Sequence, residues 1–559
     1  MSAVTTPATV AELLLERAGD TTTGLRFEDA SWTWAEVVAE SRRRARLLAE
    51  LAEAGTGPFH VGVLLENVPE YLFLLGGAAL AGATIVGINP TRRGGELEAD
   101  IRHTDCRVVI TDTGQVRLLD GLDTGAPTVL VDTDDYRARL GMPAPAERGT
   151  GGESLPGPEA LYLLLFTSGS TGAPKAVKVS QGRLAEAGLT MAKGSGFGPG
   201  DVLYCAMPLF HGNALNTALV PAFASGATFV LRRRFSASGF LADVRRYGVT
   251  YFNYVGRALT YILATPPRPD DAENTLKFAF GTDASPEDSR AFRRRFACPV
   301  VEGYGSSEGA IAMSPAPGMP KGAIGLPPPG TDVVVVDEAG VERPRARFDE
   351  EGRLLNPAEA IGEIVSRDGA GRFEGYYANP EAEAERTRQG WYWSGDLAYR
   401  DEAGYFYFAG RTSDWLRVDG ENFGAAPVER VLERFPPVRV AVVYGVPDPR
   451  TGDQVMAALE VEEPGDFDPE AFARFLAGQP DMGTKWPPRL VRLVAEVPVT
   501  GTGKVDKRPL RADRWQTADP VWWWPPEDRR PRYRRLEPAD AERLDRELEA
   551  HGRSAYLAT

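Results

Sequence analysis

A loop rich in glycine and hydroxyl residues follows an apolar strand and could hold phosphate groups. Residues 167–175 read TSGSTGAPK and come directly after the apolar run LYLLLF. Glycines let backbone N–H groups approach an anion, hydroxyl groups donate further hydrogen bonds, and the lysine adds a mobile positive charge. The glycine spacing differs from that of a Walker A loop, and no Ser or Thr follows the lysine. The segment therefore predicts a phosphate loop of another kind, the alternative being an ordinary mobile loop.

A second glycine-rich segment, EGYGSSEG, covers residues 302–309. A tyrosine between two glycines could present its flat ring to a base, and Glu308 is a hard oxygen ligand suited to Mg²⁺. The spacing G-x-G-x-x-x-G is one residue too long for a dinucleotide fingerprint, which argues against an NAD-dependent enzyme. We therefore expect contacts to a base and a metal ion here.

Two more polar segments lie in the last third of the chain. Asp396 follows a glycine after the aromatic run WYWS and could accept hydrogen bonds from both hydroxyls of a ribose. Arg411 follows the run GYFYFAG and could pair with ribose or phosphate oxygens. Lys504 lies on a glycine-flanked turn in VTGTGKVDKRPL. Taken alone, the first two residues are also compatible with a β-meander, and the lysine with an exposed loop.

The composition is that of a globular protein and excludes some classes of function. The chain has 559 residues, of which 43% are hydrophobic and 25% charged, enough for a large core. A net charge of −15 argues against sequence-independent nucleic-acid binding. The three cysteines form no CxxC pair, which favours a reducing cytoplasm over a disulfide framework or zinc site. The N-terminus lacks the basic and apolar regions of a secretory signal.

One uncharged stretch, residues 71–88, is close to the lower length limit of a membrane span. It contains two adjacent glycines and several alanines, and ends in the β-branched run ATIVGI. A buried helix followed by a buried strand explains this pattern better, so no membrane span is expected.

The elements that position these segments predict a layered α/β protein. Through about the first 300 residues, helical patterns such as residues 34–54 alternate with apolar strands such as HVGVLLE and RVVITD, which is typical of largely parallel sheets. Strands, glycines and turns then predict a β-rich subdomain up to Arg411, and a further αβ alternation predicts a small α+β domain. The expected organisation is an N-terminal domain over residues 1–410, a mobile C-terminal domain over residues 411–516 and a Trp/Pro/Arg-rich, surface-wrapping tail over residues 517–559.

The four polar segments, in this order, resemble the motifs of the adenylate-forming superfamily. That family includes acyl-CoA synthetases, the adenylation domains of peptide synthetases and the luciferases. The wording of RRGGELEADIRHTDCRVVITD, FEGYYANPEAEAERT and SDWLRVDGENF is most similar to its fatty-acyl-CoA ligase and fatty-acid transport-protein-like branch. The resemblance implies ATP, Mg²⁺ and coenzyme A as ligands and a small-molecule acid as substrate.

The resemblance also implies roles for single residues. The first segment would hold the β- and γ-phosphates through Thr167, Ser168, Gly169, Thr171 and Lys175. Tyr304 would stack on adenine, Ser307 would touch the α-phosphate, Glu308 would bind Mg²⁺, and Asp396 and Arg411 would hold the ribose. Gly281 and Asp283 lie where the family places a wall of the adenine and acyl pocket, and His211 lies at its gating position beside the substrate carboxylate, the alternative being a packed core histidine. Ser307 replaces the family's usual Thr, and Asp283 puts a purely apolar pocket in doubt.

The implied reaction has two steps. The carboxylate attacks the α-phosphorus of ATP and forms an acyl-adenylate, with Lys504 bridging the two anionic groups. The C-terminal domain then pivots about Asp414, which removes Lys504 and brings Gly420 beside the thiol arm of coenzyme A. Other acceptors stay open: an amine, or nitrite activated in place of a carboxylate to diazotise an aromatic amine. A non-catalytic nucleotide-binding protein is disfavoured by the intact Lys175 and Lys504, whereas the acid and the oligomeric state are not readable.

Overall fold

The computed structural model shows two compact units. The described residues are 8–53, 57–141, 155–167, 175–255, 258–282, 284, 286–316, 318–350, 352–411, 414–418, 421–449, 452–461, 465, 467–479, 481–483, 485–500, 504–528, 530–551 and 553. The first unit comprises Met1–Ala312 and Ala370–Thr387, and the second comprises Met313–Gly369 and Arg388–Thr559.

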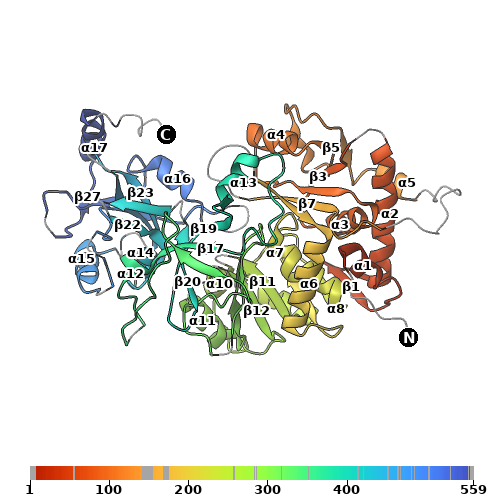
Figure 1. Cartoon of the computed structure of the whole chain (residues 1–559), viewed down its shortest axis with the longest axis horizontal. Coiled ribbons are helices and arrows are strands. Elements are labelled where there is room, and N and C mark those ends of the chain that lie inside the picture. Colours follow the sequence, from red (N-terminus) through yellow and green to blue (C-terminus); the bar gives the residue numbers. More distant parts are fainter. Residues whose placement is uncertain are drawn as a thin grey trace. The chain divides into compact units, whose positions relative to one another are not determined.

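Two mostly parallel sheets form the first unit (Figure 1). The seven-stranded sheet has the order β13 (Val300–Glu302), β12 (Phe278–Thr282), β11 (Tyr251–Val255), β9 (Val202–Cys205), β10 (Thr228–Leu231), β1 (Thr23–Phe27) and β2 (Ala30–Thr33). The six-stranded sheet has the order β6 (Thr128–Leu130), β5 (Cys106–Thr111), β3 (His60–Leu64), β4 (Thr84–Gly87), β7 (Leu161–Phe166) and β8 (Ala176–Ser180). In each sheet only one edge strand, β2 or β8, runs antiparallel to its neighbour. The prediction of a layered α/β fold with largely parallel sheets is confirmed.

Helices connect these strands and supply apolar side chains to the sheet faces. They are α1 (Val10–Leu15), α2 (Trp34–Glu53), α3 (Pro69–Ala81), α4 (Gly94–His103), η1 (Val116–Leu119), α5 (Asp134–Gly141), α6 (Gln181–Ser195), α7 (Gly212–Ala214), η2 (Leu215–Leu219), α8 (Val220–Ser225), α9 (Phe240–Tyr247), α10 (Ala258–Leu263), α11 (Pro286–Phe296) and α13 (Pro380–Arg386). Phe240, Leu259 and Phe292 from three of them pack on Phe252 and Tyr254 of β11. Two short strands, β14 (Tyr304–Gly305) and β15 (Ala312–Met313), follow β13.

The uncharged stretch of residues 71–88 is a buried helix followed by a buried strand, as predicted. Helix α3 begins at a proline and ends at Gly82, whose φ of +71° is left-handed. A Cβ at Gly76 or Gly77 would overlap Ser41 or Arg44 of α2, so the glycines allow the two helices to pack closely. No helix in the described part of the chain is both long and apolar enough to cross a membrane.

The second unit begins with an antiparallel sheet, which confirms the β-rich segment. Its strands are β16 (Val333–Val336), β17 (Gly362–Ser366), β19 (Trp391–Arg400), β18 (Thr387–Arg388) and β20 (Phe406–Arg411), with β20 paired to β19. After the hairpin of β21 (Trp415–Val418) and β22 (Glu421–Gly424), a five-stranded sheet has the order β23 (Val438–Pro447), β24 (Asp453–Val461), β25 (Leu490–Val494), β26 (Val521–Trp523) and β27 (Arg534–Arg535). The helices of this unit are α12 (Pro357–Ala360), α14 (Ala425–Leu432), α15 (Pro469–Ala477), α16 (Lys507–Asp513) and α17 (Pro538–Ala550).

The Trp-rich tail is part of the last sheet. Its strand β26 pairs antiparallel with β25, and β27 pairs with β26 (blue in Figure 1). Trp524 packs into the core on one face of this sheet, and Trp523 and Leu544 pack into the core on the other. The boundary expected between residues 516 and 517 therefore lies within one sheet, while the domain division as a whole stays a prediction.

Candidate active site

The phosphate loop lies between β7 and β8, which form an antiparallel pair. The Thr167 backbone N–H donates to the Lys175 carbonyl at 3.1 Å, so the two ends of the loop are held together. The Lys175 ammonium lies 3.1 Å from the Glu385 carboxylate, most of which is exposed. An ion pair with one exposed partner is weak, and the role of Lys175 as a phosphate ligand stays a prediction. Ser168, Gly169 and Thr171 lie outside the described residues.

The segment expected to bind adenine continues from the neighbouring strands β12 and β13. The Gly303 N–H donates to the Gly281 carbonyl at 2.9 Å. A Cβ at Gly281 would lie 2.6 Å from the Tyr254 ring, and a Cβ at Gly303 would lie 2.5 Å from the Phe280 ring. The glycines therefore let aromatic rings lie directly on the backbone, and half-buried Tyr304 follows in β14. Asp283 lies outside the described residues.

Ser307 and Glu308 are held from two sides. The Arg183 guanidinium of α6 donates to the Ser307 carbonyl. The Tyr376 hydroxyl donates to Glu308 Oε1 at 2.8 Å, and the Glu308 side chain is buried. Gly309, with a φ of +69°, ends the segment where a Cβ would meet Arg183. The backbone at Ser307 and the carboxylate of Glu308 are therefore both constrained.

Glu308 fits a Mg²⁺ ion that is bound together with a nucleotide. Among the residues that the structure describes, no three His, Cys, Asp or Glu side chains form a group able to hold a metal ion. Mg²⁺ is commonly bound by one or two carboxylates together with substrate phosphates, so a single carboxylate is sufficient. The hydrogen bond from Tyr376 uses one oxygen of Glu308, and the second is the candidate metal ligand.

His211 precedes the short helix α7 and is half-buried. A Cβ at the next residue, Gly212, would lie 3.7 Å from Ser307 Oγ, so this turn and the adenine segment are close. The following turn, η2, is a π-helix, a form often found at functional sites. The residue after His211 is therefore close to Ser307, while the gating role of His211 stays a prediction.

In the second unit, Asp396 and Arg411 are direct partners across β19 and β20. Arg411 Nε lies 3.4 Å from Asp396 Oδ1, and the Asp396 side chain is only 11% exposed. The Gly395 N–H donates to the Glu363 carboxylate at 2.7 Å and supports the backbone of β19 just before the aspartate. The two residues expected to hold the ribose are therefore neighbours.

Lys504 is hydrogen-bonded to Thr500 through its backbone. The Thr500 N–H donates to the Lys504 carbonyl at 2.6 Å, and the Lys504 N–H donates back to Thr500 Oγ1 at 3.2 Å. Val499 and Val505 form an isolated antiparallel bridge beside these bonds. Gly420, expected beside the thiol arm, lies outside the described residues.

A cluster of charges surrounds the expected hinge residue, Asp414. Its carboxylate lies 2.8 Å from the Arg511 guanidinium and 3.3 Å from Lys507 Nζ. Lys507 also reaches Glu429 Oε1 and the Val443 carbonyl, each at 2.9 Å. Burial alone would raise the pKa of Asp414, but Lys507 and Arg511 outweigh it and hold that pKa below its ordinary value. Burial opposes the charge of Lys507, yet Glu429 and Asp414 raise its pKa above the ordinary value.

Comparisons with known proteins identify the family. The sequence model of the AMP-binding enzyme family matches residues 15–377, and that of the AMP-binding enzyme C-terminal domain matches residues 427–504. The chain belongs to the AMP-binding enzymes. The predicted resemblance to adenylate-forming enzymes is thereby confirmed.

Two relatives of this AMP-binding enzyme match over nearly their whole length. Steroid-22-oyl-CoA synthetase of Rhodococcus jostii (strain RHA1) is 53% identical over 98% of this chain and 99% of its own. Medium/long-chain-fatty-acid–CoA ligase FadD17 of Mycobacterium marinum is 45% identical over 92% of this chain and 98% of its own. ATP-bound MatB from Rhodopseudomonas palustris, 24% identical, covers 90% of this chain and 98% of its own with a TM-score of 0.77, which supports the fold. The prediction of an AMP-forming acid–thiol ligase is confirmed.

Sequence reasoning about this AMP-binding enzyme missed four residues that hold the expected site residues in place. They are Arg183, Tyr376, Glu429 and Lys507. Lys507 lies in the same segment as Lys504. Lysine is scarce in this chain, so a second lysine in that segment was a usable signal. Tyr376 lies in FEGYYANP, but nothing in the sequence pairs it with a glutamate 68 positions earlier.

Proposed function

We propose that this ligase activates a steroid carboxylic acid of the 22-oyl type and transfers it to coenzyme A. The observation that carries the proposal is the 53% identity to steroid-22-oyl-CoA synthetase over 98% of this chain. A second candidate substrate is a medium- or long-chain fatty acid, supported by the 45% identity to FadD17. Both candidates are large apolar acids whose carboxylate needs activation.

In the first half-reaction, residues of the first unit bind the triphosphate. The loop from Thr167 to Lys175 surrounds the β- and γ-phosphates, and Tyr304 stacks on adenine beside Gly281. Glu308 would hold a Mg²⁺ ion, which when bound would supply positive charge to the phosphates. Preorganised donors aimed at developing charge account for most of such catalysis. The rigid support of Ser307 and Glu308 by Arg183 and Tyr376 is consistent with that role.

Asp396, Arg411 and Lys504 are assigned to the ribose and to the reacting groups. Asp396 accepts hydrogen bonds from the ribose hydroxyls, and Arg411 keeps its carboxylate oriented. Lys504 lies between the substrate carboxylate and the α-phosphate and reduces their mutual repulsion. His211 controls access of the carboxylate from the first unit.

In the second half-reaction, the C-terminal domain pivots about Asp414 and brings Gly420 to the thiol of coenzyme A. Motion of a few residues at an element end is how hinges usually work. The Asp414–Lys507–Arg511 cluster supports this assignment, because it joins the hinge residue to the helix that follows Lys504.

The test is a product analysis with purified enzyme, ATP, Mg²⁺ and coenzyme A. The acids are a steroid 22-carboxylate, octanoate, palmitate and benzoate, with nitrite plus an aromatic amine as a further arm. We expect an ATP-dependent steroid thioester in the mass spectrum and a kcat/KM at least about tenfold above that of either fatty acid, since a mismatched apolar pocket loses about 1–3 kcal/mol. A preference for fatty acids favours the second candidate, and a nitrite-dependent product without thioester overturns the acceptor.

A further inference from the structure

Residues 374–377 form a short segment whose backbone pairs with the edge of β8. The Lys178 N–H donates to the Gly375 carbonyl at 3.0 Å, and the Tyr377 N–H donates to the Ala176 carbonyl at 2.8 Å. Tyr376 is thereby paired with Val177 in an antiparallel bridge, two residues beyond Lys175. The segment is therefore anchored to the strand that leaves the phosphate loop.

A glycine is required at the second residue of this segment. Gly375 has a φ of +87°, and a Cβ there would lie 2.3 Å from Glu383 Oε2 and 2.9 Å from Lys178 Nζ. Other residues are strained at such a φ and would also displace these charged groups. The backbone geometry thus determines where the next side chain, Tyr376, points.

The Tyr376 side chain reaches from this anchored backbone to Glu308. Both side chains are buried, with 2% and 6% of their surface exposed, and the hydroxyl donates to Glu308 Oε1 at 2.8 Å. A hydrogen bond to an ionised carboxylate in a buried place is among the stronger kinds. The Tyr376 ring also packs edge-on against Phe373 at 5.0 Å, a contact that a phenylalanine would keep. The hydroxyl and the ring therefore have separate roles.

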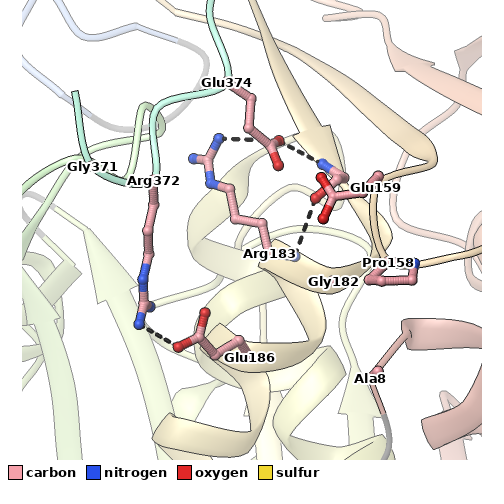
Figure 2. A pocket seen from close by; sticks show the side chains of 10 residues that line it. Ala8, Pro158, Glu159, Gly182, Arg183, Glu186, Gly371, Arg372 and Glu374 are labelled. Carbon is pink, nitrogen blue, oxygen red and sulfur yellow. Dashed lines mark hydrogen bonds and ion pairs between the residues drawn. The ribbon is translucent and has the colours of Figure 1, made fainter.

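The same segment also supports the residue beside Glu308. The Glu374 carboxylate accepts from the Ser180 N–H at 2.7 Å and lies 3.8 Å from the Arg183 guanidinium (Figure 2). That guanidinium donates to the Lys178 carbonyl at 2.9 Å and to the Ser307 carbonyl. Residues 374–377 and Arg183 therefore join strand β8, which follows the phosphate loop, to the segment that carries Ser307 and Glu308.

We propose that Tyr376 is a positioning residue that holds the Glu308 carboxylate in the orientation needed to bind Mg²⁺ with ATP. The inference rests on the proposed role of Glu308 as metal ligand and goes beyond it, because it assigns the group that orients the ligand. Loss of a hydrogen-bonding partner behind a metal ligand typically reduces metal affinity by about 10–100-fold. The role proposed for Tyr376 is to act through Glu308 rather than to bind the nucleotide or the metal itself.

The experiment measures ATP binding by titration calorimetry, with Mg²⁺ and with EDTA, for wild type and three variants. Tyr376→Phe removes only the hydroxyl. Tyr377→Phe is the matched control, since its hydroxyl donates to the exposed Asp105 at 2.8 Å. Glu308→Gln removes the expected metal ligand. The readout is the factor by which Mg²⁺ tightens ATP binding, and melting curves check that each variant is folded.

We expect this factor to fall about tenfold in Tyr376→Phe, to stay at the wild-type value in Tyr377→Phe, and to be lost in Glu308→Gln. An unchanged factor in Tyr376→Phe, with Glu308→Gln defective, overturns the inference and leaves the metal ligand in place. An equal fall in both tyrosine variants overturns it too, because the effect is then not specific to the bond with Glu308. A normal factor in Glu308→Gln shows instead that the proposed metal ligand itself is wrong.

Discussion

The charge cluster at Lys507 gives a prediction about stability whose size follows from the structure. The Lys507 ammonium is 13% exposed and contacts Glu429, Asp414 and the Val443 carbonyl within 3.3 Å. Replacing it by methionine keeps most of the packing but removes the charge. Breaking a buried ion pair costs about 3–5 kcal/mol. Asp414 keeps Arg511, and Glu429 keeps the Val443 N–H at 2.8 Å, so we expect the lower end, about 3 kcal/mol.

For a unit of this size, each 1 kcal/mol shifts the melting temperature by about 2–4 °C, so Lys507→Met should melt about 6–12 °C below wild type in scanning calorimetry. The control is Arg508→Met at the neighbouring position. Its guanidinium is 65% exposed and pairs with Asp506 at 2.8 Å, and exposed pairs contribute at most about 1 kcal/mol.

The difference in unfolding free energy between Lys507→Met and wild type should depend on pH. The pKa of Lys507 is raised, so its contribution is present at neutral pH and is lost only above the ordinary lysine value of about 10.4. The pKa of Asp414 is lowered, so its contribution is present above the ordinary value of about 3.9 and is lost as pH falls further. The difference in unfolding free energy should therefore be constant from about pH 5 to 9 and shrink below about pH 4. A melting temperature of Lys507→Met within about 2 °C of wild type, the shift expected from losing one weak exposed ion pair, would refute this reasoning.

Three further predictions concern the active site and the tail. Lys504→Ala should abolish ATP–pyrophosphate exchange while supplied acyl-AMP still gives thioester with coenzyme A; equal loss of both half-reactions would contradict the bridging role. Gly281→Ala should lose about 1–3 kcal/mol in denaturant unfolding and bind ATP more weakly, because the new Cβ would lie 2.6 Å from the buried Tyr254 ring; wild-type values for both would show that the ring moves freely. Trp523→Ala should lose about 3–5 kcal/mol of stability, because the indole is only 1% exposed. A loss below about 1 kcal/mol would show that the tail is not part of the core.

Much of the fold is readable from local sequence patterns, because buried parallel strands are continuous apolar runs and their connecting helices have one apolar face. The strand LYLLLF before the phosphate loop and the helix over residues 34–53 are examples. The tail is not readable in this way. Its strand is only three residues long and pairs with a strand about 30 positions earlier, so neither length nor alternation reveals it.

The candidate site likewise contains residues that local sequence patterns reveal and residues that they do not. Residues expected to contact ligands lie in glycine-rich or polar segments with distinctive composition, and these can be found from the sequence. Residues that support them, such as Tyr376 and Lys507, act through partners far away in the chain. Ordinary residue types at unremarkable spacings carry no local signal of such pairings, which depend on tertiary packing.

The pairing of β25 with β26 has a consequence for the order in which the protein becomes competent during synthesis. Leu490 pairs with Trp523, so Lys504 lies in the chain between two strands that are hydrogen-bonded to each other. A ribosome makes the lysine before it makes the second of these strands. The nascent chain therefore carries every residue expected to bind phosphate in the first unit before the segment around Lys504 has a second anchor, and a product terminated near residue 516 would lack that anchor permanently. The second anchor of the Lys504 segment thus forms only after residues 521–523 have been made.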